Sequence, residues 1–278
     1  MEIYRVAGEV DVLNDAAEIP GIGVLPVNAF LLRSAQPMLV DTGMGMAHDE
    51  FVKSVESLID LTDIRWIWLT HPDRDHTGAL LSLLEAAPSA RLVTTYAAVG
   101  YLGTDMHVPM EKVFLLNPGQ TLDLGDRTVT AFRPPAFDSP MTVGFKDNKS
   151  GFVFSSDCFG APMASREAAA AEDVSRVGDD ALRGAQLLWA SIDSPWLSLV
   201  EPAVFAAAVD EVRAFAPSAV FSSHLPPAVG GTDRLFANLT TAAGLEPFVG
   251  PDQEALMAIL GQIADIPEQA AAPVPTTT

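Results

Sequence analysis

Short apolar runs bounded by Gly and Pro alternate along the chain with stretches of helical period. Residues 24–32 and 38–40 are runs of the first kind and predict strands. Residues 50–59 space their apolar side chains as one face of a helix. The compact apolar run 65–69 is followed at once by polar residues, which predicts a buried strand ending in a loop. The same reasoning predicts strands at 91–94, 113–116, 128–132, 141–145, 151–155 and 219–222, and helices at 77–87, 181–190, 202–215, 232–243 and 252–264.

This order of elements indicates the fold class. Strand–helix alternation combined with antiparallel hairpins, one of them expected at 121–127 with its turn at Gly125-Asp126, predicts layered sheets covered by helices, an α/β (α+β) fold. We expect one domain over residues 1–265, with polar residues gathered at strand ends. Residues 266–278 are rich in Ala, Pro and Thr, a composition typical of a disordered tail.

The charge balance argues against two classes of partner. The chain has 16 Lys and Arg against 36 Asp and Glu, for a net charge of −20. Such a surface repels phosphate backbones and anionic lipid, so we expect neither nucleic-acid nor membrane partners. We see no signal peptide and no apolar run of membrane-spanning length, so the expected localisation is cytoplasmic. The single cysteine, Cys158, excludes an internal disulfide and a cysteine-based zinc cage.

Candidate chemistry gathers in one loop. Residues 71–76 read His-Pro-Asp-Arg-Asp-His, between the strand expected at 65–69 and the helix expected at 77–87. A loop can aim alternate side chains at one point, and imidazoles and carboxylates at this density bind metals readily. A solvated, charged turn that caps the following helix is the alternative. The position directly after a buried strand favours the metal site.

The loop resembles the metal-binding loop of the metallo-β-lactamase superfamily, usually written HxHxDH. It is more similar to the HxExDH loop of the flavodiiron branch and its flavin-free relatives, the oxygen-binding diiron proteins, with Asp73 in the place of the acid. Four further segments resemble that branch: the Asp-Thr-Gly turn in 39–43, the hairpin 118–125, the Ser-Ser-Asp-Cys-Phe-Gly run in 154–160, and the strand end 222–224. The resemblance implies a four-layer αββα metallo-β-lactamase sandwich.

The resemblance also implies a set of metal ligands, namely His71, Asp73, Asp75, His76, Asp157 and His224. His71 and Asp73 would bind the first metal. Asp75 and His224 would bind the second, and Asp157 would bridge the two. Asp75 and Asp157 are the candidate catalytic residues.

Observations at several other positions qualify this set. The family's third histidine at the first metal falls here on Pro135 or Ala136, neither of which binds a metal. Asp138 or water could substitute, or the first site could be weak or empty; otherwise Asp138 is interpreted as a hydrogen-bonded turn residue beside the site. Asp41 would stand behind a ligand and orient it through a hydrogen bond. His76 would bind the second metal in the hydrolases, whereas in flavodiiron-like proteins the residue at that position often stays off the metal.

The ligand types favour iron as the bound metal, with manganese or zinc as alternatives, because carboxylates prefer hard ions. The resemblance implies two metal ions that bind or reduce dioxygen or nitric oxide, both small-molecule ligands. A hydrolase that cleaves esters, lactones, thioesters or phosphodiesters with a metal-activated water is the alternative. A metal-binding protein without turnover is the third. We expect no flavin on this chain, which is too short for a flavodoxin-like domain, so a reductase would need an external electron donor. A homodimer is left open.

Overall fold

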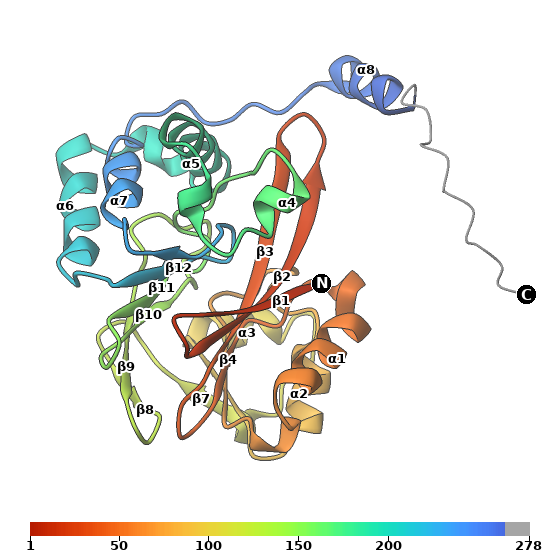
Figure 1. Ribbon diagram of the computed structural model, residues 1–278, viewed down its shortest axis with the longest axis vertical. Coiled ribbons are helices and arrows are strands. Elements are labelled where there is room, and N and C mark those ends of the chain that lie inside the picture. Colours follow the sequence, from red (N-terminus) through yellow and green to blue (C-terminus); the bar gives the residue numbers. More distant parts are fainter. Residues whose placement is uncertain (265–278) are drawn as a thin grey trace, which may run out of the picture.

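A computed structural model describes residues 1–264, and within them two β-sheets lie face to face with helices on their outer sides (Figure 1). The first sheet follows the chain in the order β1 (Glu2–Val6), β2 (Val10–Ile19), β3 (Gly23–Leu32), β4 (Met38–Val40), β5 (Trp66–Trp68), β6 (Arg91–Thr94) and β7 (Val113–Leu115). The second sheet has the order β13 (Ala228–Val229), β12 (Ala219–Phe221), β11 (Phe152–Phe154), β10 (Gly144–Asp147), β9 (Thr128–Phe132) and β8 (Thr121–Asp123).

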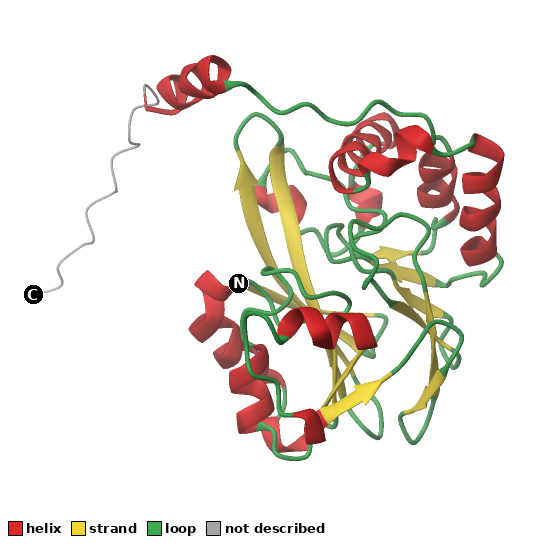
Figure 2. Cartoon of the chain, turned by 180° about the vertical axis from the view of Figure 1, so that it is seen from behind, coloured by secondary structure: helices red, strands yellow, loops and turns green. Residues whose placement is uncertain are grey.

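Helices cover the outer face of each sheet (Figure 2). The helices on the first sheet are α1 (His48–Leu58), α2 (Leu80–Ala86) and α3 (Tyr96–Leu102). Those on the second sheet include α5 (Asp179–Asp193), α6 (Pro202–Arg213) and α7 (Asp233–Thr240). The short helix α4 (Arg166–Ala169) contacts β3. These layers confirm the predicted αββα architecture.

The period of two along each strand divides the apolar side chains between the layers. In β11, Phe152 and Phe154 face the space between the sheets, whereas Val153 faces the outer helices. The rings of Phe145, Phe154 and Phe221 stack in that inner layer at centroid distances of 4.4 and 4.8 Å. This aromatic layer joins the second sheet to the first, because Phe30 of β3 packs edge-on against it.

The first two strands, β1 and β2, were not predicted, because β2 buries polar side chains. Asp11 is 1% exposed and forms ion pairs of 2.7 Å with both Arg5 and Arg33. Asn14 is also buried and donates to the side chain of Asn28 on β3 at 2.7 Å. A search for apolar runs misses such a strand, since its polar groups are satisfied by partners distant in the sequence.

Most other boundaries lie within a few residues of their predicted positions. The helix expected at 77–87 begins only at Leu80, because the preceding residues belong to the loop described below. The helix α3 was not predicted. At the other end of the chain, α8 (Gln253–Ala264) lies apart from the layers, beyond the β2–β3 hairpin (Figure 1). The tail expected at 266–278 lies outside the described residues. None of the described helices combines the length and the apolar character needed to cross a membrane.

The parallel strand pairs position the polar loops. β4 pairs in parallel with β5, and β11 pairs in parallel with β12, so each pair ends at one edge of its sheet. Three strands end at Trp68, Phe154 and Phe221, and three residues later stand His71, Asp157 and His224. The fold therefore brings these three side chains to a common edge of the sandwich.

Candidate metal centre

The loop after β5 is fixed by close backbone contacts. The amide of Thr42 donates to the carbonyl of His76 at 2.8 Å, and the amide of Gly78 donates to the carbonyl of Gly43 at 2.8 Å. A Cβ atom at Gly78 would lie 2.3 Å from the carbonyl carbon of Met44, so no side chain fits there. The Asp-Thr-Gly turn and the Thr-Gly step after His76 thus form one unit that holds the loop's ligands.

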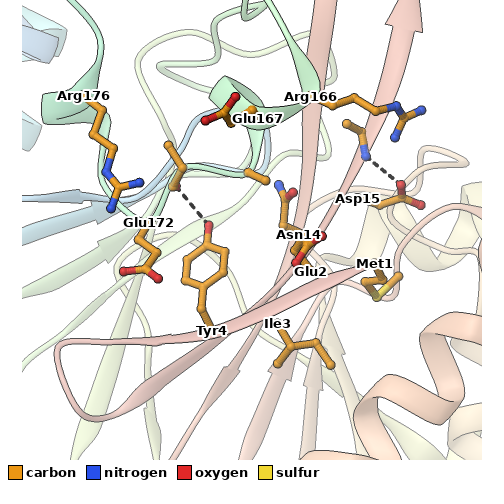
Figure 3. A pocket seen from close by; sticks show the side chains of 13 residues that line it. Met1, Glu2, Ile3, Tyr4, Asn14, Asp15, Arg166, Glu167, Glu172 and Arg176 are labelled. Carbon is orange, nitrogen blue, oxygen red and sulfur yellow. Dashed lines mark hydrogen bonds between the residues drawn. The ribbon is translucent and has the colours of Figure 1, made fainter.

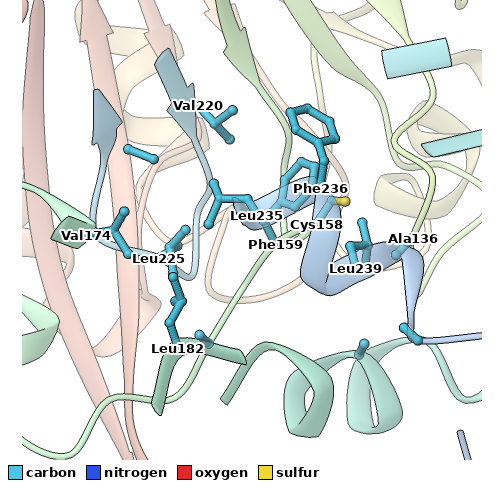
Figure 4. Packing of buried hydrophobic residues seen from close by; sticks show 14 of the residues in the cluster. Ala136, Cys158, Phe159, Val174, Leu182, Val220, Leu225, Leu235, Phe236 and Leu239 are labelled. Atoms are coloured by element: carbon cyan, nitrogen blue, oxygen red, sulfur yellow. The ribbon is translucent and has the colours of Figure 1, made fainter. Parts of the chain in front are cut away.

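The loop after β11 holds Asp157 in a strained backbone. Ser156 and Phe159 have φ values of 55° and 71°, which residues other than Gly rarely adopt. Phe159 and Cys158 belong to the buried cluster beneath α5 and α7 shown in Figure 4. These apolar anchors compensate for the strain and hold the Asp157 carboxylate at the strand end. Burial also raises the pKa of the Cys158 thiol, so that thiol stays protonated.

Each of the three site histidines uses Nδ1 for a local partner. Nδ1 of His224 donates to the carbonyl of Pro26 at 2.7 Å, and Nδ1 of His76 lies 2.9 Å from Oδ2 of Asp41. Nδ1 of His71 lies 3.1 Å from the hydroxyl of Ser156. Partners of this kind fix the ring orientation of metal-binding histidines and leave Nε2 free to bind.

The Nε2 atoms point to one centre, where buried polar atoms have no hydrogen-bond partner. Within the described residues, Nε2 of His71, Nε2 of His76 and Oδ1 of Asp157 are buried and unpaired. Leaving such groups without a partner costs about 1–3 kcal/mol each. A cation at this centre would satisfy them.

Asp157 divides the centre into two ligand sets. Its Oδ2 lies 3.4 Å from Nε2 of His71, whereas its Oδ1 lies 3.3 Å from Nε2 of both His76 and His224. Oδ2 of Asp75 lies 3.4 Å from the same two Nε2 atoms of His76 and His224. We call Asp75, His76, His224 and Oδ1 of Asp157 set B.

The other set, set A, comprises Asp73, Asp138, His71 and Oδ2 of Asp157. Nε2 of His71 lies 3.8 Å from Oδ2 of Asp73 and 3.8 Å from Oδ2 of Asp138. Asp138 thus lies as far from Nε2 of His71 as Asp73 does, and its Oδ1 accepts a hydrogen bond of 3.3 Å from the hydroxyl of Thr142. Pro135 is buried, and Ala136 belongs to the hydrophobic cluster under the helices. The loop after β9 turns so that Asp138, and neither of these, faces set A.

The atom separations fit two metal ions. Ligands bound at about 2.1 Å around a tetrahedral ion lie about 3.4 Å from one another. The observed separations of 3.3 to 3.8 Å agree with this value. The four carboxylates of the two sets, Asp73, Asp75, Asp138 and Asp157, carry four negative charges, which equal the positive charge of two divalent ions. The residues present therefore fit a dinuclear centre.

Electrostatic coupling within the sets is strong. Burial alone would raise the pKa of the Asp157 carboxyl, but the surrounding imidazoles, His71 foremost, hold it well below its usual range. Burial alone would lower the pKa of His224, but Asp157 and Asp75 raise it to about 9. The pKa of His76 is raised well above its usual value by the same two carboxylates and by Asp41. The raised pKa values of His76 and His224 favour protonated rings opposite Asp75 and Asp157 when no cation is bound.

Asp193, at the end of α5, was missed by sequence reasoning. Its carboxylate lies close to those of Asp138 and Asp157, with the three oxygens within 4.8 Å of one another. Burial, followed by the charges of Asp157 and Asp138, raises its pKa well above the usual value. No sequence motif surrounds Asp193. Trp189 lies one helical turn before it and donates to the carbonyl of Asp157 at 3.2 Å. This contact of α5 brings Asp193 to the site.

One side of the centre opens to solvent. Asp73 and Asp75 line a pocket of about 470 Å³ together with Arg74, Tyr101 and Asp105. Another pocket, between β1, β2 and the α4 region, holds none of the predicted ligands (Figure 3). It is lined by Tyr4, whose hydroxyl donates to the carbonyl of Ala171, and by charged side chains of both signs. A third pocket, of about 590 Å³, is lined by Asp75 and by Met44 and Met46, so the candidate centre borders solvent at Asp73 and Asp75.

The chain resembles known proteins in sequence and in fold. Residues 25–184 match the family described as ODP family beta lactamase. The anaerobic nitric oxide reductase flavorubredoxin of Salmonella typhi is 31% identical over 134 residues, which are 48% of this chain. The match covers only 28% of that relative, so the chain corresponds to a part of it.

Two solved structures share the fold. Rubredoxin oxygen:oxidoreductase from Desulfovibrio gigas has a TM-score of 0.71 at 18% identity and covers 86% of this chain and 61% of its own. The flavodiiron protein from Giardia intestinalis has a TM-score of 0.74 at 15% identity and covers 87% of this chain and 59% of its own. Because the family match spans more than half of the 278 residues, the chain belongs to the ODP family of beta lactamases, as a metallo-β-lactamase-fold protein of flavodiiron-like type.

Proposed function

We propose that this chain binds two metal ions, of which iron is the favoured kind, and that it binds or reduces dioxygen or nitric oxide between them. The observation that carries the proposal is the position of Asp157, whose two oxygens face two different ligand sets. A bridging carboxylate of this kind holds two ions close enough to act on one small molecule. Bound iron would supply the electrons and the open coordination positions for that chemistry.

The chain's own residues hold and orient the centre. Asp157 is buried and sets the spacing between the two ligand sets, and Asp41 fixes the ring of His76 from behind. Asp73 and Asp75 are partly exposed and border the pocket, so a small molecule approaching from solvent meets this side. The side chains of His71, His76 and His224 are at most 2% exposed, and they close the opposite side against water.

The names of the relatives favour redox chemistry. Flavorubredoxin is called a nitric oxide reductase and the Desulfovibrio gigas protein a rubredoxin oxygen:oxidoreductase, so we place reduction before the hydrolytic alternative. A reductase of this kind takes electrons from a separate donor, for which a reduced rubredoxin is the first candidate. In this proposal residues 1–265 work as one metallo-β-lactamase-like domain with six ligands from the sequence motifs and Asp138 as the seventh.

The proposal is tested by loading metal-free protein with ferrous iron in the absence of oxygen. We expect two irons per chain after desalting, and consumption of nitric oxide or dioxygen when a reduced rubredoxin is added. Asp157→Asn should lose the paired centre and this activity. Asp105→Asn is the matched control, since Asp105 lines the pocket but belongs to neither ligand set.

The outcome separates the alternatives. Two irons with consumption of either gas in the wild type and in Asp105→Asn, but not in Asp157→Asn, supports the proposal. Protein that retains its circular dichroism spectrum and takes up no iron contradicts it. So does protein that binds zinc and cleaves esters while the iron-loaded form leaves both gases untouched.

A further inference from the structure

The two ligand sets differ in the kind of atom they offer. Set B presents the imidazole nitrogens of His76 and His224 beside the carboxylates of Asp75 and Asp157. In set A the imidazole of His71 lies beside carboxylates. A ring nitrogen of His76, which belongs to set B, also lies within 4.8 Å of the ligand atoms of His71 and Asp157. The difference arises at Asp138, where a carboxylate and not a second imidazole faces Nε2 of His71.

Asp193 adds a further carboxylate beside set A. Its carboxylate lies within 4.8 Å of the ligand atoms of Asp138 and Asp157, and therefore on the side of set A. Its Oδ2 accepts a hydrogen bond of 2.9 Å from the hydroxyl of Ser194, which fixes the side chain at the end of α5. Trp189, on the same face of α5, holds the helix against the carbonyl of Asp157. Asp193 is thus placed by the packing of α5 and is not a freely rotating surface acid.

Three acidic side chains gather on the side of set A. Asp138, Asp157 and Asp193 bring three carboxylates together where Asp157 is only 5% exposed. The unpaired Nε2 of His71 aims at the same place and is fully buried. A positive ion with a preference for oxygen at set A would satisfy the Nε2 atom of His71 and reduce the repulsion among the neighbouring carboxylates.

Ligand type governs which ion each set prefers. Carboxylate oxygens suit hard ions such as manganese, and imidazole nitrogens suit zinc and copper. We propose that the two halves of the centre differ in metal preference when ions compete: set A, with Asp193 beside it, favours a hard ion such as Mn²⁺ over Zn²⁺, and set B favours the ion that prefers imidazole. This inference rests on the proposed dinuclear centre and adds a division of metals within it.

A competition experiment tests the division. Metal-free protein is exposed to one equivalent of zinc per chain and to manganese in large excess, because the general affinity order favours zinc at either set. After desalting, both metals are counted by mass spectrometry. We expect the wild type to retain one manganese and one zinc per chain.

Two opposite substitutions, one in each set, identify which half binds which metal. Asp138→His gives set A a second imidazole and should lower the manganese-to-zinc ratio by about tenfold or more, the size of effect seen when even an outer partner of a ligand is lost. His224→Asp removes an imidazole from set B and should raise the same ratio. Asp193→Asn should lower manganese retention without changing zinc retention. Circular dichroism shows that each variant is folded.

The possible results separate this inference from the proposed function. Zinc in both halves of single wild-type chains, or equal shifts of the ratio in the two opposite substitutions, overturns the division of metals and leaves the dinuclear centre standing. Folded wild type that retains neither metal overturns both. A manganese-to-zinc ratio that falls in Asp138→His and rises in His224→Asp supports the division.

Discussion

Trp189 donates its indole N–H to the backbone carbonyl of Asp157 across 3.2 Å, and this bond ties helix α5 to the loop that carries the shared carboxylate. The same ring lies edge-on to His224, with centroids 5.0 Å apart. A Cβ atom at Gly160 would lie 2.5 Å from the indole nitrogen, so the loop has a glycine where the helix approaches it. The metal centre and α5 are therefore one packed unit.

Tryptophan fluorescence should report metal binding. Because Trp189 contacts His224, iron or manganese at set B should strongly quench the emission of this residue. Titrating metal-free protein with ferrous iron should lower the total emission, and Trp189→Phe should remove most of that change. Trp66 packs with Phe114 at the start of β5, the end of the strand away from His71, so Trp66→Phe is the control that keeps the quenching. Equal quenching in both variants would show that no metal lies beside His224.

The close approach at Gly78 predicts a large loss of stability. Gly78→Ala would push a methyl group into the backbone of residues 43–45 and should cost about 3 kcal/mol or more, as overpacked buried sites do. Gly184→Ala is the matched control, because Gly184 lies in α5 with open space around it, and there alanine should stabilise by about 0.5–1 kcal/mol. Urea denaturation measures both. A Gly78→Ala protein as stable as the wild type would contradict the packing of the loop.

Asp41 should matter for metal affinity although it is not a ligand. Its carboxylate accepts from the amide and hydroxyl of Thr70 at 2.8 Å, and its Oδ2 lies 2.9 Å from Nδ1 of His76. Losing such a partner usually weakens metal binding about 10–100-fold, and we expect Asp41→Asn to do so in a competition with a chelator. Asp63→Asn, in the exposed turn before β5, should leave the affinity unchanged. Unchanged affinity in Asp41→Asn would exclude His76 as a ligand that Asp41 orients.

The raised pKa of His224 predicts how the metal-free protein responds to pH. Burial opposes the charge, but Asp157 and Asp75 raise the pKa to about 9, above the value of about 6.5 expected in the unfolded chain. Protonated His224 therefore contributes stability that is complete below pH 6.5 and is lost as the pH rises through 9, on the order of 3 kcal/mol. Thermal unfolding in the presence of a chelator should show this loss, and His224→Asn should flatten it. A wild-type stability that rises between pH 7 and 9 would refute the assignment.

The strands of the fold could be predicted where both faces are apolar. Val40, Trp68 and Phe154 lie in buried strands that a local pattern reveals. Strand β2 could not be predicted, since Asp11 and Asn14 are buried with partners that only the folded sheet supplies. A local pattern reveals whether each side chain is apolar or polar, whereas the burial of a polar side chain depends on a partner distant in the sequence.

The candidate site likewise could be predicted only in part. The ligands expected from the motifs around His71, Asp157 and His224 meet at one centre, because each stands three residues beyond a buried strand end. Asp138 and Asp193 lack such a signal. Asp138 reaches the centre through the turn of an irregular loop, and Asp193 reaches it only because α5 packs on the Asp157 loop. Tertiary packing, and not a strand-end motif, therefore brings Asp138 and Asp193 to the centre.

The central claim is that Asp157 lies between two metal ions. The most direct measurement is an anomalous difference map from crystals of iron-loaded protein, with data collected above and below the iron absorption edge. Two peaks are predicted, one between Oδ2 of Asp157 and Nε2 of His71, and the other between Oδ1 of Asp157 and Nε2 of His224. A single peak, or none at this carboxylate in a well-ordered crystal, would contradict the account.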